Sequence, residues 1–186
     1  MRKPILSIML AVMLILVSCG DKEAHMKKIK EEVTNELNTQ MENEKEALKE
    51  IVRNFYQALS TTPNDNTAAG VSEWMAIDWK STPTPAGGAD MEGFVKTLFM
   101  FHGMIPDLKW DVQEMLVDGN QVIVRSIASG TPNSPEGYFF GTPTDGTKKF
   151  EVMTIDIHTV EDGKMVSAHH VEDWLTAVGQ VGPSKE

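Results

Sequence analysis

The sequence predicts an α+β protein in which helices come first and an antiparallel sheet follows. Apolar residues recur with helical spacing up to about residue 106, and from Leu108 onward they alternate with polar residues, as in half-buried strands. Asp118-Gly119 and Asp162-Gly163 each separate two alternating runs, which is a strong signal for a β-hairpin. This order of elements is typical of helices packed on one face of a curved sheet.

The first residues have the pattern of an export signal. Two basic residues precede an apolar run from Ile5 to Val17, which is shorter than the roughly 20 residues that cross a bilayer. The sequence LVSC at Leu16–Cys19 resembles a bacterial lipobox. We therefore expect residues 1–18 to be a lipoprotein signal peptide and Cys19 to carry the lipid; an ordinary signal peptide or a short anchor helix are the alternatives.

Composition and charge limit the partners of the processed chain. Two of the 17 Lys and Arg residues lie in the signal segment, so 15 remain against 27 Asp and Glu, a formal charge of −12. Such an acidic surface repels phosphate backbones, so no nucleic-acid binding is expected. Cys19 is the only cysteine, which excludes an intramolecular disulfide and a metal site built on several thiolates. The expected location is the bacterial cell envelope, on a membrane that holds the lipid.

Residues 19–45 are expected to form a lipid-anchored helical spacer. They are rich in Glu, Lys, Asn and Gln, and a narrow apolar stripe recurs at every fourth position: Ile29, Val33, Leu37 and Met41. Such a stripe fits a spacer that holds the domain away from the membrane, and it also fits a short self-association helix. It is too short and too dilute to predict a coiled coil.

A globular domain is predicted over residues 46–182, followed by a tail at 183–186. The first helix has a broad apolar face, the second is short, and the third is capped by Asp90 and ends before a glycine and a proline. An extended piece and a loop rich in Pro and Gly separate the second helix from the third. The predicted helices span residues 46–59, 67–75 and 90–103, and the extended piece spans 76–80.

Four strands are predicted after these helices, because the period changes from helical to alternating. A long loop around the aromatic patch Tyr138–Phe140 separates the second strand from the third. The predicted strands are Leu108–Val117, Gln121–Thr131, Phe150–Val160 and Lys164–Trp174.

The last predicted hairpin concentrates ionisable side chains, and its register decides which of them face the core. With a three-residue loop, Glu161–Gly163, Asp156 faces Ala168 and lies diagonally from His170 on one face of the sheet. We favour this register. The same face then also carries Thr154, His158 and Glu172.

A two-residue loop at Asp162-Gly163 is the alternative. It places Asp156 opposite His169 and turns His170 to the other face. If His170 points outward, the hairpin has a structural role and no functional one. The inward register instead gives a polar cluster on an otherwise apolar strand pair.

Four segments occur in a recognisable order: EIVRNFYQAL, FHGMIPDLKWDVQEMLVDGNQVIVRSIASGT, GYFFGTPTDGTKKF and TIDIHTVEDGKMVSAHHVEDWLTAVGQVG. This order resembles the SnoaL-like polyketide cyclase or ester cyclase family of the NTF2-like superfold. The resemblance covers about residues 46–182. It rests on the succession F-x-x-x-I-P-D-L, D-G-x-x-V, G-T-P and D-G-K, since no single motif is specific.

The resemblance implies a cone, in which a curved sheet wraps around three helices and encloses an apolar pocket. Family members that act on polyketides close a ring by an intramolecular aldol reaction without metal or cofactor, so no cofactor and no metal are expected. They use an aspartate on the last strand and a histidine on the preceding strand. Here the two residue types are exchanged, since His170 lies on the last strand and Asp156 on the one before it.

These positions give the expected site. His170 is expected to act as the base that removes a proton next to a carbonyl group, and Asp156 is expected to orient it. Thr154 and His158 are expected to donate hydrogen bonds to the ligand. Tyr56 and Trp79 complete the expected pocket, whose ligand is a small apolar molecule. The extended piece, where the family often has Asn or His, offers only Trp79, Ser81 and Thr82.

A second function fits the same fold. NTF2-like cones also serve as non-catalytic binding or assembly modules, so a homodimer formed through the sheet is expected as well. An ion pair between Arg125 and Asp156 would favour a structural role for that aspartate. A deep pocket with Asp156 and His170 on its wall would favour the enzyme.

Overall fold

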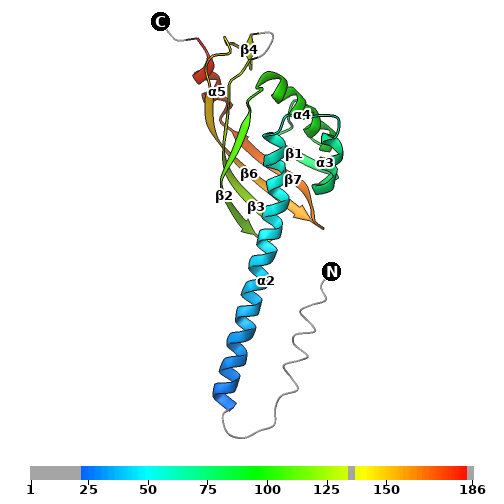
Figure 1. The fold of residues 1–186 in the computed structure, drawn as a ribbon, viewed down its shortest axis with the longest axis vertical. Helices are drawn as coiled ribbons and strands as arrows, with labels where there is room; N and C mark the ends of the chain where they lie inside the picture. The colour runs from blue at the N-terminus through cyan, green and yellow to red at the C-terminus, as the bar shows by residue number, and fades with distance from the viewer. Residues whose placement is uncertain (1–21, 134–136, 184–186) are drawn as a thin grey trace. The chain divides into compact units, whose positions relative to one another are not determined.

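The computed structural model describes residues 22–133 and 137–183 (Figure 1). The predicted signal peptide and Cys19 lie outside the described residues. Among the helices that the structure does describe, none is both long enough and apolar enough to cross a bilayer.

One continuous helix, α2 (Lys22–Leu59), covers both the expected spacer and the expected first helix of the domain. Contacts divide the chain into two units between Asn43 and Glu44, so α2 contributes to both. In the first unit the stripe residues Val33, Leu37 and Met41 are exposed. In the second unit the helix buries its apolar face: Val52, Phe55, Tyr56 and Leu59.

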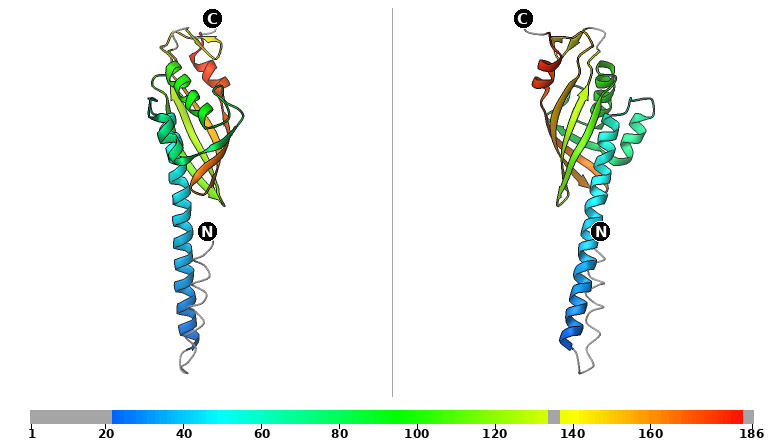
Figure 2. Two further views of the ribbon diagram at one scale, coloured as in Figure 1. Left: turned by 90° about the vertical axis from the view of Figure 1, so that its right-hand side faces the viewer. Right: turned by 60° about the vertical axis from the view of Figure 1, so that its left-hand side comes forward.

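Two further helices, α3 (Thr67–Trp74) and α4 (Met91–Met104), lie on the same side of the sheet as the end of α2 (Figure 2). The predicted cap of α4 is confirmed, because Asp90 accepts a hydrogen bond of 2.8 Å from the backbone N–H of Gly93. Such a cap satisfies one of the backbone donors that the first turn of a helix leaves free.

The main sheet has five strands in the order β1-β7-β6-β3-β2. The last four strands in this order pair antiparallel, whereas β1 lies parallel to β7, so the sheet is mixed. The α+β class is confirmed, and the predicted extended piece is a full strand at the edge. The strands are β1 (Met75–Thr82), β2 (Lys109–Asp118), β3 (Gln121–Gly130), β6 (Phe150–Glu161) and β7 (Lys164–Glu172).

Three short elements were not expected from the sequence. The loop after β3 contains a small ribbon of β4 (Tyr138–Phe139) and β5 (Thr142–Pro143). The last strand ends at Glu172, and a fourth helix, α5 (Trp174–Val181), follows it. Asp173 caps α5 by accepting a hydrogen bond from the backbone N–H of Thr176.

The core lies between the helices and the concave side of the sheet. Every second residue of β6 faces this core, which buries Val152, Thr154 and Asp156 on one line. The same face of β6 buries a third polar side chain, His158, and an uncompensated polar group is costly in such a core.

Candidate functional site

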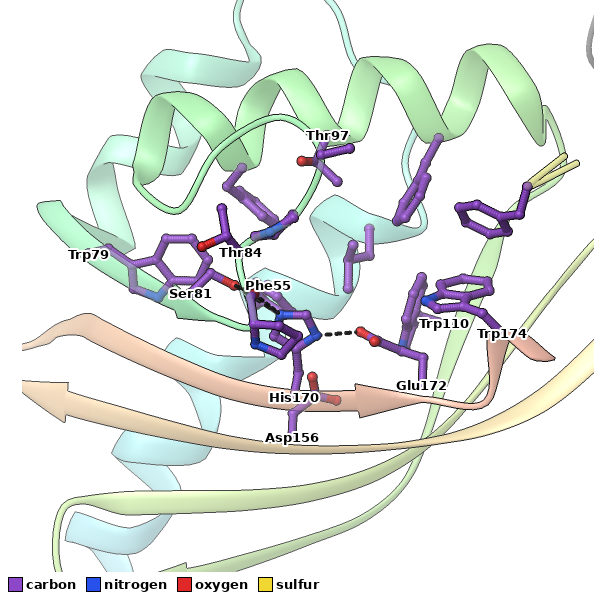
Figure 3. Close-up of a pocket in the computed structure, with 17 residues that line it drawn as sticks. Phe55, Trp79, Ser81, Thr84, Thr97, Trp110, Asp156, His170, Glu172 and Trp174 are labelled. Carbon is purple, nitrogen blue, oxygen red and sulfur yellow. Dashed lines mark hydrogen bonds and ion pairs between the residues drawn. The ribbon is translucent and has the colours of Figure 1, made fainter. Parts of the chain in front are cut away.

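A cavity of about 240 Å³ lies between the concave side of the sheet, α4 and the loop after β1 (Figure 3). Its wall is largely aromatic, with rings contributed by Phe55, Trp79, Phe94, Phe101, Trp110, Phe140 and Trp174. The polar part of the wall consists of Ser81, Thr84, Thr97, Asp156, His170 and Glu172. An apolar cavity with a few convergent polar groups is the usual form of a small-molecule site.

The hairpin of β6 and β7 brings Asp156 and His170 together. The loop has two residues, because Glu161 pairs with Lys164, so the favoured three-residue loop is wrong. A bulge at Val166 then shifts the register, and Asp156 lies directly opposite His170. The expected pairing of Asp156 with Ala168 is therefore also wrong. The common face of Asp156 and His170 is nevertheless the one that the three-residue loop had predicted.

His170 is held between acceptors at both ring nitrogens. Its Nδ1 lies 2.7 Å from Glu172 Oε1, and its Nε2 lies 2.9 Å from the carbonyl oxygen of Pro83 and 3.0 Å from Ser81 Oγ. A carbonyl oxygen only accepts, so Nε2 carries hydrogen, and Nδ1 shares a proton with the Glu172 carboxylate. Burial lowers the pKa of His170, but the hydrogen bond and charge of Glu172, the Pro83 carbonyl oxygen and the charge of Asp156 together outweigh it, so the net pKa is raised.

Asp156 is only 3% exposed and lies among aromatic side chains. Its Oδ2 accepts a hydrogen bond of 2.9 Å from Tyr56 and a longer one of 3.4 Å from Thr154. Burial raises its pKa, the Tyr56 hydrogen bond lowers it, the Glu172 charge raises it and the His170 charge lowers it, and the result is a pKa of about 7. A carboxyl group with this pKa exchanges protons readily near neutral pH.

These contacts favour other roles for Asp156 and His170 than those that the sequence suggested. A histidine with hydrogen on both ring nitrogens has no lone pair to take a proton from a ligand. The carboxyl group of Asp156 has one oxygen, Oδ1, for which no hydrogen bond occurs within residues 22–133 and 137–183. The geometry therefore favours Asp156 as the proton carrier and His170 as a fixed positive charge beside it.

The remaining expected pocket residues divide into two groups. Trp79 lines the cavity, and its ring lies on the opposite side of His170 from Trp110 and Trp174 (Figure 3). The other three residues lie behind the wall and contact Asp156 or its neighbours: Tyr56, Thr154 and His158. Thr154 is itself held by Trp110 Nε1 at 3.1 Å and by Ser126 Oγ at 2.6 Å.

Arg125 does not neutralise Asp156. Its Nε lies 3.5 Å from Glu114 Oε2, and both side chains are substantially exposed. In the β3–β6 ladder Arg125 pairs with Ile155, whereas Asp156 pairs with Val124. The ion pair that would make Asp156 a structural residue is therefore not formed.

Sequence reasoning gave no role to two side chains that contact His170. Glu172 was placed on the correct face, and Ser81 was noted on the extended piece, but neither was given a role. Glu172 fixes His170 at Nδ1, and Ser81 lies beside its Nε2 (Figure 3). The alternation of β7 could have identified Glu172. The contact of Pro83 with His170 left no signal in the sequence.

The donor atoms of Asp156, His170 and Glu172 lie within 4.8 Å of one another, a spacing that suits a metal ion. A metal there would have to replace the proton that His170 shares with Glu172. Because both ring nitrogens already face acceptors, these contacts favour hydrogen bonding by His170 over metal coordination.

Comparisons with known proteins agree with this fold. A family model described as SnoaL-like polyketide cyclase matches residues 49–181. A comparison with curated proteins gives no match.

Solved structures are similar in fold. TsrD from Streptomyces laurentii has a TM-score of 0.61 at 22% identity, over 73% of this chain and 95% of that one. IdmH from Streptomyces antibioticus has a TM-score of 0.58 at 23% identity, over 72% of this chain and 96% of that one. A SnoaL-like polyketide cyclase from Agrobacterium tumefaciens has a TM-score of 0.56 at 17% identity, over 69% of this chain and 93% of that one. At these identities the structures show the fold, while the family model covers most of the domain. The chain therefore belongs to the SnoaL-like polyketide cyclase family.

Proposed function

We propose that the cavity binds a small, largely apolar carbonyl compound and that Asp156 moves a proton on it, in an aldol-type cyclisation or an isomerisation. The observation that carries this proposal is a buried carboxyl group with a pKa of about 7 on the wall of an aromatic cavity. Strongly shifted pKa values concentrate at catalytic sites.

In the proposed reaction Asp156 Oδ1 takes the proton from the carbon next to the carbonyl group, which leaves an enolate. The positive charge of His170 stabilises the enolate, and the Ser81 hydroxyl, 3.0 Å from His170 Nε2, donates a hydrogen bond to its oxygen. In a cyclisation the enolate carbon attacks a second carbonyl group, and the new alkoxide takes the proton back from Asp156. In an isomerisation the proton returns to another carbon. Protons balance in both cases without a cofactor.

The size of the cavity limits the substrate. Drug-sized ligands occupy cavities of about 300–1,000 Å³, and this cavity holds about 240 Å³. Rings on opposite sides of His170 favour a flat molecule between them. We therefore expect a substrate with one ring or two fused rings, or a short chain that closes to one ring.

The test uses small aryl-substituted ketones such as 4-phenyl-2-butanone in D₂O. NMR measures the rate at which the protons next to the carbonyl group exchange for deuterium. The rate of this exchange is expected to be lower in Asp156→Asn by a factor of about 10² or more, the usual contribution of a positioned base. The matched control is Glu151→Gln, which neutralises an exposed carboxylate on the same strand. Equal exchange by wild type and Asp156→Asn would remove Asp156 from the reaction.

The competing function is a non-catalytic binding module. Quenching of tryptophan fluorescence by the same ketones, without any catalysed exchange, would support that function, because Trp79, Trp110 and Trp174 line the cavity. Arg125 pairs with Glu114 and not with Asp156, which favours the enzyme instead.

The attachment to a membrane is part of the proposal and rests on the lipobox-like sequence at Leu16–Cys19. Wild type expressed in a bacterium is expected in the membrane fraction, with a mass that fits lipid on Cys19. Cys19→Ser is expected to remain unprocessed and unlipidated. Identical masses and fractions for both chains would contradict the attachment.

Homodimer formation through the sheet is also proposed. Three apolar residues on the outward face are exposed: Leu116 at 56%, Met153 at 52% and Val171 at 62%. An apolar face of this kind is typical of a protein interface. Sedimentation of wild type as a dimer and of Val171→Glu as a monomer would support it, and a monomeric wild type would contradict it.

A further inference from the structure

Two buried titratable side chains lie behind the wall of the cavity, where they do not reach a ligand. Tyr56 and His158 are both buried, and neither lines the cavity. The Tyr56 hydroxyl oxygen lies 2.9 Å from Asp156 Oδ2 and 2.9 Å from His158 Nε2. The three side chains therefore form one chain of hydrogen bonds that ends at the cavity.

The number of hydrogen atoms fixes the direction of this chain. Tyr56 has one hydroxyl hydrogen and donates it to Asp156, so His158 must donate from Nε2 to the tyrosine oxygen. Burial lowers the pKa of His158 to about 3, so the ring is neutral and carries a single N–H. With this hydrogen on Nε2, His158 Nδ1 is a bare acceptor.

The surroundings of His158 oppose the reverse direction. Its Nδ1 is buried without a hydrogen-bond partner in the part of the chain that the structure describes. If the hydrogen moved to Nδ1, a donor would be buried with no acceptor, and orphaned buried N–H groups are rarer than under-satisfied acceptors. Only the Nε2–H form lets both hydrogen bonds of the chain point toward Asp156.

We propose that Tyr56 and His158 are positioning residues that keep Asp156 Oδ2 occupied as an acceptor, so that the proton exchanged with the substrate stays on Oδ1. This inference rests on the proposed role of Asp156 as proton carrier. The chain prevents loss of the proton into the core, because Tyr56 can accept a proton from Asp156 only if His158 adopts the unfavourable tautomer.

The same chain sets the acidity of Asp156. The titratable groups that face it are Tyr56 from α2, His158 from its own strand, and His170 and Glu172 from β7. The other elements packed around it contribute uncharged polar groups here: Ser81 from β1, Thr97 from α4 and Ser126 from β3. Among these contacts, the Tyr56 hydrogen bond is the largest that favours the charged carboxylate.

The first test needs no variant. Long-range ¹H–¹⁵N correlation spectra of the full chain report the tautomer of each histidine. His158 is expected to be neutral with hydrogen on Nε2 from pH 5 to pH 8. A His158 ring with hydrogen on Nδ1, or a ring that becomes charged in this range, would overturn the proposal.

The second test measures the acidity of Asp156 by ¹³C NMR of carboxyl-labelled aspartate, with its signal assigned by its loss in Asp156→Asn. Tyr56→Phe is expected to raise the midpoint by roughly one to two pH units, the equivalent of a hydrogen bond to a charged group. His158→Phe removes the donor to Tyr56 and is expected to raise the midpoint of Asp156 less than Tyr56→Phe does. His158→Gln keeps an N–H donor and is expected to stay closer to wild type.

An unchanged midpoint in Tyr56→Phe, or equal midpoints in the two His158 variants, would overturn the proposal. Neither measurement uses a substrate. If the titrations behave as expected and no ketone exchanges its protons, the proposed function fails while the hydrogen-bond chain stands. If Tyr56→Phe does not fold, the tautomer of His158 in the wild-type chain decides.

Discussion

At the scale of single residues, the proposed function and the stability of the fold make opposite demands on Asp156. Its pKa is about 7 in the folded protein, and its ordinary value is 3.8. The folded state therefore binds this proton more tightly than the unfolded state does. The favourable contribution of the protonated form is complete below about pH 4 and is lost as the pH rises through 7.

Replacement of Asp156 by asparagine is expected to stabilise the fold, and to do so more at pH 8 than at pH 5. At pH 8 the variant no longer buries a charge, and the free energy of unfolding is expected to increase by up to about 4 kcal/mol, since one pKa unit corresponds to about 1.4 kcal/mol. Urea denaturation at both pH values measures this difference. His158 is present in both chains, so its own pH dependence cancels. An equal gain at both pH values would contradict the shifted pKa of Asp156.

At the scale of elements, the β6–β7 hairpin combines a tight turn with a bulge. Asp162 and Gly163 both have positive φ, at 48° and 78°, as a two-residue turn of type I′ requires. This turn alone would turn His170 away from the cavity. The extra residue at Val166 reverses that outcome, because a bulge adds one residue to one strand only.

Deletion of Val166 is therefore expected to leave His170 opposite Asp156, since the strand continues in regular pairing from Met165 to Ser167. Insertion of an alanine after Ser167 is the matched control, and it is expected to turn His170 outward. Cross-strand NOEs between β6 and β7, and the raised pKa of His170 in an NMR titration, report the register. Loss of the raised pKa in the deletion variant alone would contradict the assigned bulge.

At the scale of the whole molecule, the buried residues of α2 all lie between Val52 and Leu59. A chain that begins at Glu44 is therefore expected to melt within a few degrees of one that begins at Lys22, because the removed residues bury little apolar surface. Circular dichroism melting of both chains tests this. A drop of 10 °C or more would show that residues 22–43 stabilise the domain.

The sequence was sufficient for the fold class, because the change from helical to alternating period near Leu108 is long and regular. The parallel pairing of β1 with β7 could not be predicted, since the two strands lie far apart in the chain and periodicity carries no information on partners. For the candidate site, residue type and alternation placed Asp156 and His170 on one face of the sheet, and the structure has them there. The bulge was not found, because Val166 and Ser167 leave the alternation ambiguous.

The bulge at Val166 also affects how this chain should be compared with its relatives. An ungapped alignment with a relative that has the same two-residue turn and no bulge assigns His169 to the position opposite Asp156. A gap between Gly163 and Ser167 assigns His170 instead. One gap thus determines which of two adjacent histidines, on opposite faces of β7, is compared with the last-strand residue of a relative.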